Sequence, residues 1–330
     1  MFNGVIQILI EGPCMKKNLH VLFRIVLLGL LTGRTVAKPI IPPKLYHDGD
    51  IPLKNGQRHS SFPYISGDTF RNIAQFYVDE TRTPIDPDDV KYGDIIFIQT
   101  RMKEFFFKVI HPLIKTRYIL ISHNCFSNAT EQFAHMLDDE KLIAWFAKNI
   151  DIDHPKLLPI PLGIGNSYKK NGNIKSLNGV MTKTQNIKKD KLLYLNLTAK
   201  NNPKVRQEVL KLFKHQAFCH KGKNKPWKDY LIDVASSKFV LSPRGTGEDC
   251  YRTWEALLMG SIPIVKSSAI NSLFEDLPVV IVNEWSEATE DFLNKKYGEM
   301  SSKSYKMEKI YAAYWLNMIF EVQKTSRNMG

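Results

Sequence analysis

Residues 238–265, KFVLSPRGTGEDCYRTWEALLMGSIPIV, decide the fold. The apolar run over Lys238–Ser242 predicts a strand, and a loop with two glycines follows it. Apolar spacing then predicts a helix over Glu248–Met259, and Ile262–Val265 predicts the next strand. A strand, a crossover helix and a second apolar strand are typical of a parallel sheet covered on both faces, so we expect an α/β fold.

The loop in this stretch has the composition of an anion site. Its two glycines let a ligand approach the main chain. The first amides of a helix have no partner within it and carry about half a positive charge. Arg244 stands beside them, and its planar fork of donors suits a diphosphate. The predicted anion-binding residues of the loop are Arg244, Gly245, Thr246, Gly247, Glu248 and Asp249.

The predicted helix has two faces. One stripe packs against the core and comprises Tyr251, Trp254, Leu257 and Leu258. Glu248, Arg252 and Glu255 fall on another stripe, which we expect to face a cleft. A carboxylate at Glu255 is well placed to accept hydrogen bonds from a ribose diol. The alternative, that Glu255 pairs with Arg252 on a solvated face, stays open.

The same loop argues against nicotinamide binding. Gly245-Thr246-Gly247 begins a G-x-G-x-x-G fingerprint, but Cys250 occupies the place of the third glycine. Lys266 follows the next strand, where a dinucleotide site needs an acid.

The pattern of apolar strands and amphipathic helices extends over most of the chain and predicts two α/β domains in series, 61–165 and 166–330. The proline-rich stretch Leu157–Gly165 cannot propagate a helix and marks the boundary. The predicted elements of the first domain are strands Asp94–Thr100 and Tyr118–Ser122 and helices Glu104–Ile114 and Glu131–Asn149. Those of the second, beyond the central stretch, are strands Lys191–Leu197 and Val279–Val282, helices Pro203–Lys214 and Lys228–Ser236, and a closing helix over Tyr305–Gln323.

Composition and net charge indicate a folded protein whose binding partners are anionic. The 330 residues are 43% hydrophobic and 24% charged, which excludes a disordered chain. Lysine and arginine (46) exceed aspartate and glutamate (33), giving a net charge of +13 that favours anionic partners. No nucleic-acid motif with interleaved aromatic residues accompanies this charge, so we expect no nucleic-acid partner.

The N-terminus predicts entry into the secretory pathway. An apolar stretch over 21–31 follows Lys16 and Lys17, which is typical of a secretory signal or a signal anchor within residues 1–37. Whether it is cleaved or retained in a membrane stays open. Residues 38–60 are proline-rich and predict a stem. The expected location is the Golgi or endoplasmic reticulum lumen, or the envelope of a bacterium, and Asn128 and Asn196 begin glycosylation sequons.

No metal is predicted. The cysteines Cys14, Cys125, Cys219 and Cys250 lack metal-ligand spacing, and one disulfide among the last three stays open. Asp-x-Asp pairs occur at 48–50, 86–88 and 151–153, but none follows a convincing apolar strand.

The central stretch, from Ser242-Pro243-Arg244-Gly245 through Arg252 and Trp254-Glu255-Ala256-Leu257 to Ile262-Pro263, resembles the nucleotide-sugar signature of exostosin-like glycosyltransferases. Shorter stretches, at 93–97, 122–124 and 154–163, are similar to other parts of that family. The resemblance implies a GT-B architecture, in which two Rossmann-like domains with parallel sheets face a cleft. It further implies that Glu255 binds the ribose and that Arg244 and Arg252 hold the diphosphate of a donor, most often a uridine one.

Two more residues are candidates. His123, at the end of a predicted strand, is a candidate general base, with a structural turn histidine as the alternative. Arg206, near Asn201 and Lys204, is a candidate second phosphate contact, with a solvated helix start as the alternative.

Two functions remain open at this stage. The first is an enzyme, a hexosyl- or pentosyltransferase, that moves a sugar from a nucleotide sugar to a glycan or glycoprotein acceptor without an obligatory metal. The second is a non-catalytic module that binds acidic glycans and keeps a vestigial nucleotide cleft.

Overall fold

A computed structural model describes residues 39–43 and 58–329. The predicted signal or anchor, most of the predicted stem, Cys14 and the Asp-x-Asp pair at 48–50 lie outside these residues. No helix of the described part is long and apolar enough to cross a membrane.

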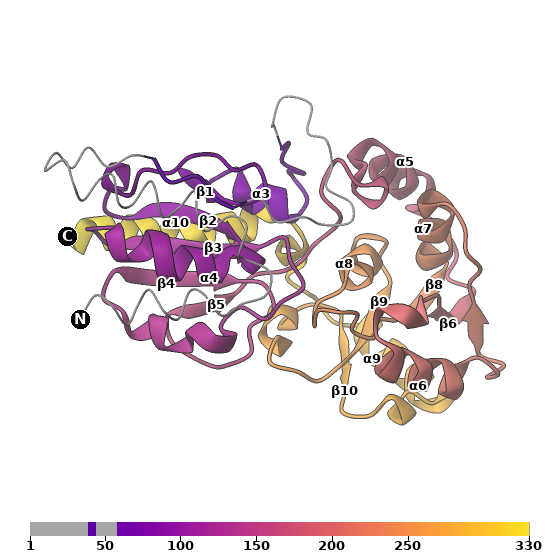
Figure 1. Ribbon diagram of the computed structural model, residues 1–330. Helices are drawn as coiled ribbons and strands as arrows, with labels where there is room; N and C mark the ends of the chain where they lie inside the picture. The colour runs from indigo at the N-terminus through magenta and orange to yellow at the C-terminus, as the bar shows by residue number, and fades with distance from the viewer. Residues whose placement is uncertain (1–38, 44–57, 330) are drawn as a thin grey trace, which may run out of the picture.

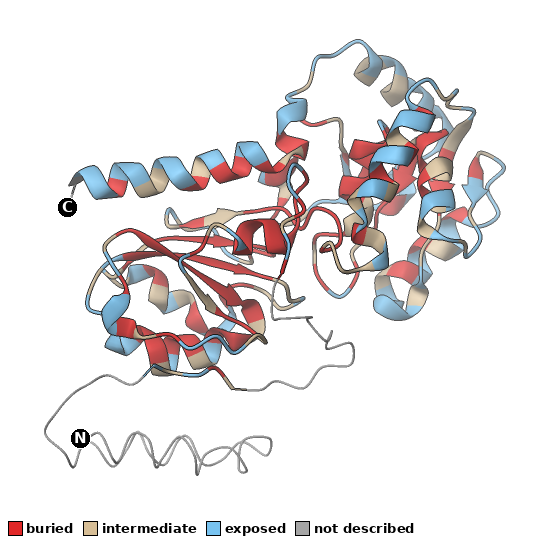
Figure 2. Ribbon diagram, turned by 90° about the horizontal axis from the view of Figure 1, so that it is seen from above, coloured by how far each residue is buried: buried red, intermediate tan, exposed pale blue. Residues whose placement is uncertain are grey.

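The described chain folds around two five-stranded parallel sheets, which confirms the α/β class (Figure 1). We call the elements around each sheet the first and the second unit. Two parallel sheets of this kind are compatible with two Rossmann-like domains. In the first sheet the strands lie in chain order, and the three central strands are almost entirely buried (Figure 2). They are β1 (Phe76–Val78), β2 (Asp94–Gln99), β3 (Tyr118–His123), β4 (Leu142–Ala147) and β5 (Leu157–Pro159).

In the second sheet the strand order is β10-β9-β8-β6-β7. The chain therefore runs from β6 to one side of the sheet and returns to the other, and the order reverses between β6 and β8. Such a reversal opens a crevice at the carboxyl ends of the two strands. The strands are β6 (Lys191–Leu195), β7 (Cys219–Lys221), β8 (Ser237–Leu241), β9 (Ile262–Lys266) and β10 (Val280–Val282).

The second sheet is apolar on both faces because each face packs into a different core. One core contains Leu193, Phe239 and Ile264 together with Val209 of α6 (Pro203–Phe213). Tyr194 and Val240 lie in the other core, which continues into the first unit. This two-sided burial explains why the strands are continuous apolar runs.

The helices follow recognisable start signals. Asn202 accepts a hydrogen bond from the Val205 amide, and Pro203 occupies the first helical position of α6. Asn173 caps α5 in the same way. The helices are α3 (Gly67–Arg71), α4 (Lys103–Phe105), α5 (Ile174–Thr184), α6 (Pro203–Phe213), α7 (Trp227–Ala235), α8 (Tyr251–Leu258), α9 (Glu290–Ser301) and α10 (Ala312–Met329).

The closing helix lies in an unexpected place. We expected a helix over Tyr305–Gln323 that closes the second unit; α10 begins at Ala312 and lies along the first sheet (Figure 1). Gln323 donates to the Gly93 carbonyl at 2.7 Å, and Arg327 pairs with Asp94 at 3.2 Å. An amphipathic pattern identifies the buried side of a helix but not the sheet that covers it. The sequence therefore did not show that the C-terminal helix packs on the first unit.

The predicted helix over Glu131–Asn149 is wrong. A 3₁₀ segment spans Glu131–Asp138, and Leu142–Ala147 is the strand β4. Phe133 and Leu137 are helically spaced, but the following run Leu-Ile-Ala-Trp-Phe-Ala is apolar on both sides and fits a central strand. Short apolar runs do not separate these two states by periodicity alone.

Two further boundaries differ. The helix expected over Glu104–Ile114 is a series of short segments from Thr100 to Leu113, with a π-helical turn over Phe106–Ile110. The helix expected from Glu248 begins at Tyr251, so Glu248 and Asp249 belong to the loop before it.

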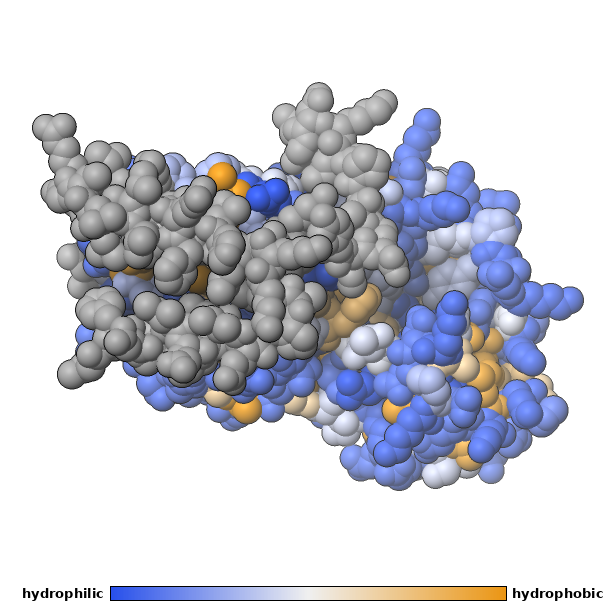
Figure 3. Space-filling view, in the orientation of Figure 1, coloured by the Kyte–Doolittle hydropathy of each residue, from blue (hydrophilic) through white to orange (hydrophobic). Residues whose placement is uncertain are grey.

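The surface of the second unit is mostly hydrophilic in the view of Figure 3, in keeping with the net charge.

Ile319→Ala tests the placement of α10. Ile319 is fully buried, whereas its neighbour Phe320 is 40% exposed. We expect Ile319→Ala to lower the free energy of unfolding by about 2–5 kcal/mol in urea denaturation. The control, Phe320→Ala, is expected to change it by less than about 1 kcal/mol. Equal effects of the two substitutions would contradict the buried face assigned here.

Candidate functional site

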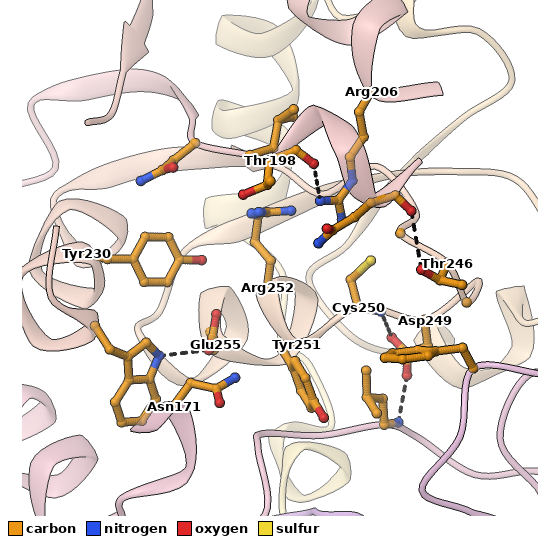
Figure 4. Close-up of a pocket in the computed structure, with 18 of the residues that line it drawn as sticks. Asn171, Thr198, Arg206, Tyr230, Thr246, Asp249, Cys250, Tyr251, Arg252 and Glu255 are labelled. Carbon is orange, nitrogen blue, oxygen red and sulfur yellow. Dashed lines mark hydrogen bonds between the residues drawn. The ribbon is translucent and has the colours of Figure 1, made fainter. Parts of the chain in front are cut away.

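A cavity of about 570 Å³ lies where the strand order of the second sheet reverses. Segments after β6 and β8 and parts of α7 and α8 form its walls (Figure 4). Three residues that precede the second sheet in the chain also line it: Phe126, Leu162 and Asn171. A crevice at this point of a parallel sheet is where such folds bind ligands.

The floor of the cavity is the loop between β8 and α8. Helix α8 starts after Cys250, whose side chain makes no capping hydrogen bond. Cys250, Tyr251 and Arg252 line the cavity, so the start of α8 lies at the cavity wall. Asn202 donates to the Gly245 carbonyl at 2.9 Å, so α6 holds the loop from the other side.

Glu255 lies one turn into α8 and is 4% exposed. Trp227 of α7 donates from Nε1 to Glu255 Oε1 at 2.8 Å, which fixes the carboxyl group at the cavity wall. Burial raises the pKa of this carboxyl. The face predicted for Glu255 is therefore correct, but the residue is buried, and its hydrogen-bond partner is Trp227 instead of solvent.

Two arginines converge at the other end of the cavity. The guanidinium groups of Arg206 and Arg252 point toward the same region beside Thr198 (Figure 4). Arg206 donates to the carbonyls of Thr198 (3.0 Å) and Arg244 (3.1 Å). Burial, and then the nearby charge of Arg252, lowers the pKa of Arg206.

The nearest acid to these two cations in the described chain is Glu255, whose pKa the charge of Arg252 lowers against the effect of burial. Within the described residues, neither arginine forms an ion pair, and Arg252 Nε is buried without a hydrogen-bond partner. Two like charges held close together, with Arg206 buried and Arg252 half-buried, favour an anion between them.

Asp249 lines the cavity, but its carboxylate is occupied. It accepts hydrogen bonds from the amides of Leu162 and Cys250, each at 2.7 Å, and from Trp254 Nε1 at 2.8 Å. Its own amide donates to Asn149 Oδ1 at 3.2 Å. Asp249 therefore joins the loop of the second unit to the chain that follows β4 and β5, and an oxyanion has no donor to meet there.

Arg244 lies outside the main cavity. It forms an ion pair with Glu248, and both residues line a smaller cavity of about 180 Å³ on the other side of the loop, next to Lys266. The late start of α8 explains this, because the extended loop turns these side chains toward β9 and away from β6. The structure brings together Gly245, Thr246, Gly247, Asp249, Arg252, Glu255 and Arg206, and it leaves out Arg244, Glu248 and His123.

His123 ends β3 but does not reach the cavity. Its Nδ1 accepts from the Asn124 amide at 2.7 Å, and its Nε2 lies 3.2 Å from the Pro161 carbonyl. The ring is 1% exposed, and burial lowers its pKa to about 3. In this arrangement His123 has the contacts of a structural turn histidine.

Several cavity residues were missed from the sequence. Trp227 and Tyr230 come from α7, Asn196 and Thr198 follow β6, and Phe126 comes from the first unit. The position of Asn196 just after an apolar strand was a usable signal, whereas the contribution of α7 depends on packing. Because Asn196 lines the cavity, a glycan on this sequon would obstruct it.

Neither a metal site nor a disulfide is seen in the described part of the chain. It holds no group of three potential metal ligands, and Cys125, Cys219 and Cys250 are free. Asp88 instead pairs with Lys115, and Asp151 accepts from the Thr130 amide.

Gly247→Ala tests the close approach of the loop to the first unit. A Cβ atom at Gly247 would lie 2.6 Å from Asn149 Nδ2, which is held by the Phe126 carbonyl. We expect a loss of about 1–3 kcal/mol in the free energy of unfolding. At Gly179 in α5 an added Cβ meets nothing, so the control Gly179→Ala should stabilise by up to about 1 kcal/mol. A neutral Gly247→Ala variant would contradict the tight contact.

Comparison with known protein families finds one match, in the second unit. Residues 178–323 match the family described as the RXYLT1 C-terminal domain, which is related to exostosin-like glycosyltransferases. The match covers the second sheet from β6 to β10, all of α8 and most of α10. No curated protein matches the chain.

Proposed function

We propose that this protein is a glycosyltransferase of GT-B architecture that moves a sugar from a uridine diphosphate sugar to a glycan or glycoprotein acceptor. One observation carries the proposal: Arg206 and Arg252 converge without an ion pair beside the uncapped start of α8, one turn from the buried Glu255. The spacing suits a diphosphate followed by a ribose. The family matched by residues 178–323 supports a transferase of xylosyltransferase-like type, so UDP-xylose is the first donor to test.

The ribose is assigned to Glu255. A carboxylate accepts two hydrogen bonds from a vicinal diol, and hydrogen bonds to a charged group contribute about 1.5–3 kcal/mol each. The bond from Trp227 occupies part of Oε1 and leaves the other oxygen for the sugar. The base then lies toward Asn196 and Asn224, whose side-chain amides offer donors and acceptors.

The diphosphate is assigned to Arg206, Arg252 and the loop amides. Sugar transfer breaks the anomeric C–O bond, and negative charge develops on the leaving phosphate. Fixed donors aimed at that charge contribute about 3–4 kcal/mol each in comparable sites. Two arginines and a helix start supply positive charge, so the proposal includes no obligatory metal.

The cellular setting is part of the proposal. A signal or anchor within residues 1–37 would bring the protein into the Golgi or endoplasmic reticulum lumen, where nucleotide sugars are imported. The alternative function, a non-catalytic module for acidic glycans, requires a vestigial cavity. The two arginines that converge without ion-pair partners favour a cavity that still binds a nucleotide.

Arg252→Ala tests the diphosphate assignment. We expect it to weaken UDP binding at least tenfold in calorimetric titration, because a charge-assisted contact of about 1.5–3 kcal/mol is lost. Arg244→Ala is the matched control, since Arg244 lies on the other side of the loop. It should change the affinity less than threefold. The reverse order of effects, or no UDP binding by the wild type, would refute the assignment.

Glu255→Gln tests the ribose assignment. The wild type should bind UDP about tenfold more tightly than 2′-deoxy-UDP, because the deoxy ligand has lost one of the two hydroxyl groups that donate to Glu255. The variant keeps the side-chain shape and an acceptor for Trp227 but loses the charge, and its preference for UDP should fall to about twofold. An unchanged preference would place the ribose elsewhere.

A further inference from the structure

Phe126 is an exposed aromatic side chain at the edge of the cavity. It lies in the loop after β3, lines the cavity and is 53% exposed. The other aromatic cavity residues, Trp227, Tyr230 and Tyr251, come from helices of the second unit. Phe126 therefore presents an apolar ring from the opposite side.

The loop that carries Phe126 is held firmly. Asn166 donates to Asn124 Oδ1 at 3.0 Å, and Lys103 Nζ donates to the Asn128 carbonyl at 2.7 Å. Asn149 Nδ2 donates to the carbonyl of Phe126 itself at 3.1 Å. These hydrogen bonds fix the main chain on both sides of Phe126, so the ring projects from an anchored loop.

Asn149 also fixes the distance between Phe126 and the anion-binding loop. The same side chain that donates to Phe126 accepts from the Asp249 amide at 3.2 Å. One side chain, that of Asn149, therefore holds the main chain of Phe126 next to the loop Gly245–Asp249. Along a bound nucleotide sugar the order is base, ribose, diphosphate, sugar, and the link through Asn149 puts Phe126 beside the loop to which the diphosphate is assigned.

The surroundings of the ring restrict what it binds. The ammonium group of Lys148 lies over the ring, 5.8 Å from its centroid, so this face holds a cation. The remaining ring surface offers no hydrogen-bond donor or acceptor. It suits the C–H face of a sugar, which is apolar, and the hydroxyl groups of the sugar point outward to other partners.

We propose that Phe126 is a stacking platform for a sugar ring at the site of transfer. This inference rests on the proposed function and adds to it a residue of the first unit that positions a sugar. The ring stacks on either the transferred sugar of the donor or the sugar of the acceptor. Both present the same C–H face, and the two arms of the experiment separate them.

The experiment uses the full chain with Phe126→Ala, Phe126→Trp and the control Phe320→Ala, which removes an exposed ring on α10. The first arm titrates UDP and UDP-xylose by calorimetry. The second arm measures saturation-transfer NMR of methyl β-D-xylopyranoside and methyl β-D-glucopyranoside with the UDP-saturated protein. Thermal unfolding is recorded for every variant.

A donor-side platform predicts that Phe126→Ala weakens UDP-xylose about tenfold and leaves UDP within twofold. An acceptor-side platform predicts unchanged UDP-xylose affinity and loss of the glycoside signal. In either case Phe126→Trp and Phe320→Ala resemble the wild type. If Phe126→Ala matches the wild type in both arms, or weakens UDP equally, the platform is refuted while the proposed function stands. A wild type that binds no UDP refutes both.

Discussion

The buried carboxylate of Asp249 is the interaction on which the site depends. Three donors surround it, and one of them, the Leu162 amide, belongs to the chain that follows the first sheet. Burial raises the pKa of this carboxyl, and hydrogen bonds from Leu162 and Trp254 oppose that rise. A buried charge is stable only when its lone pairs are filled, so the loop cannot leave this position without a large cost. The anion-binding loop is thereby fixed relative to both units.

The two units supply different side chains to the cavity. The second unit supplies Arg206, Arg252 and Glu255, all of which face the cavity from one side. The chain before it supplies few side chains, and Phe126 is the exposed one among them. The unit matched by the family thus contains the two arginines and the buried carboxylate, and residues before it complete the lining of the cavity.

Local pattern was enough to predict β6, β8, β9 and β10 of the second sheet, whereas the short edge strand β7 was missed. Strands β6, β8 and β9 are continuous apolar runs because two cores cover them, and Pro203 and Asn202 mark the start of α6. The strand β4 was missed because Leu142–Ala147 continues a helically spaced segment. The placement of α10 was missed because its partner sheet is distant in sequence.

Within the site, residues near one another in sequence were partly separated by the fold. Arg244 and Glu248 belong to the predicted loop, yet α8 begins three residues later than expected, and both side chains lie on the far side. Arg206 was the weaker candidate from sequence and lies in the cavity. Its place in the cavity depends on how α6 packs against the loop, and no local sequence pattern shows that packing.

The most direct measurement of the central claim is a crystal structure of the protein with UDP. The account predicts the ribose hydroxyls within hydrogen-bond distance of Glu255 and the diphosphate between Arg206 and Arg252. A nucleotide bound in the smaller cavity beside Arg244, or away from the β6 and β8 ends, would contradict it.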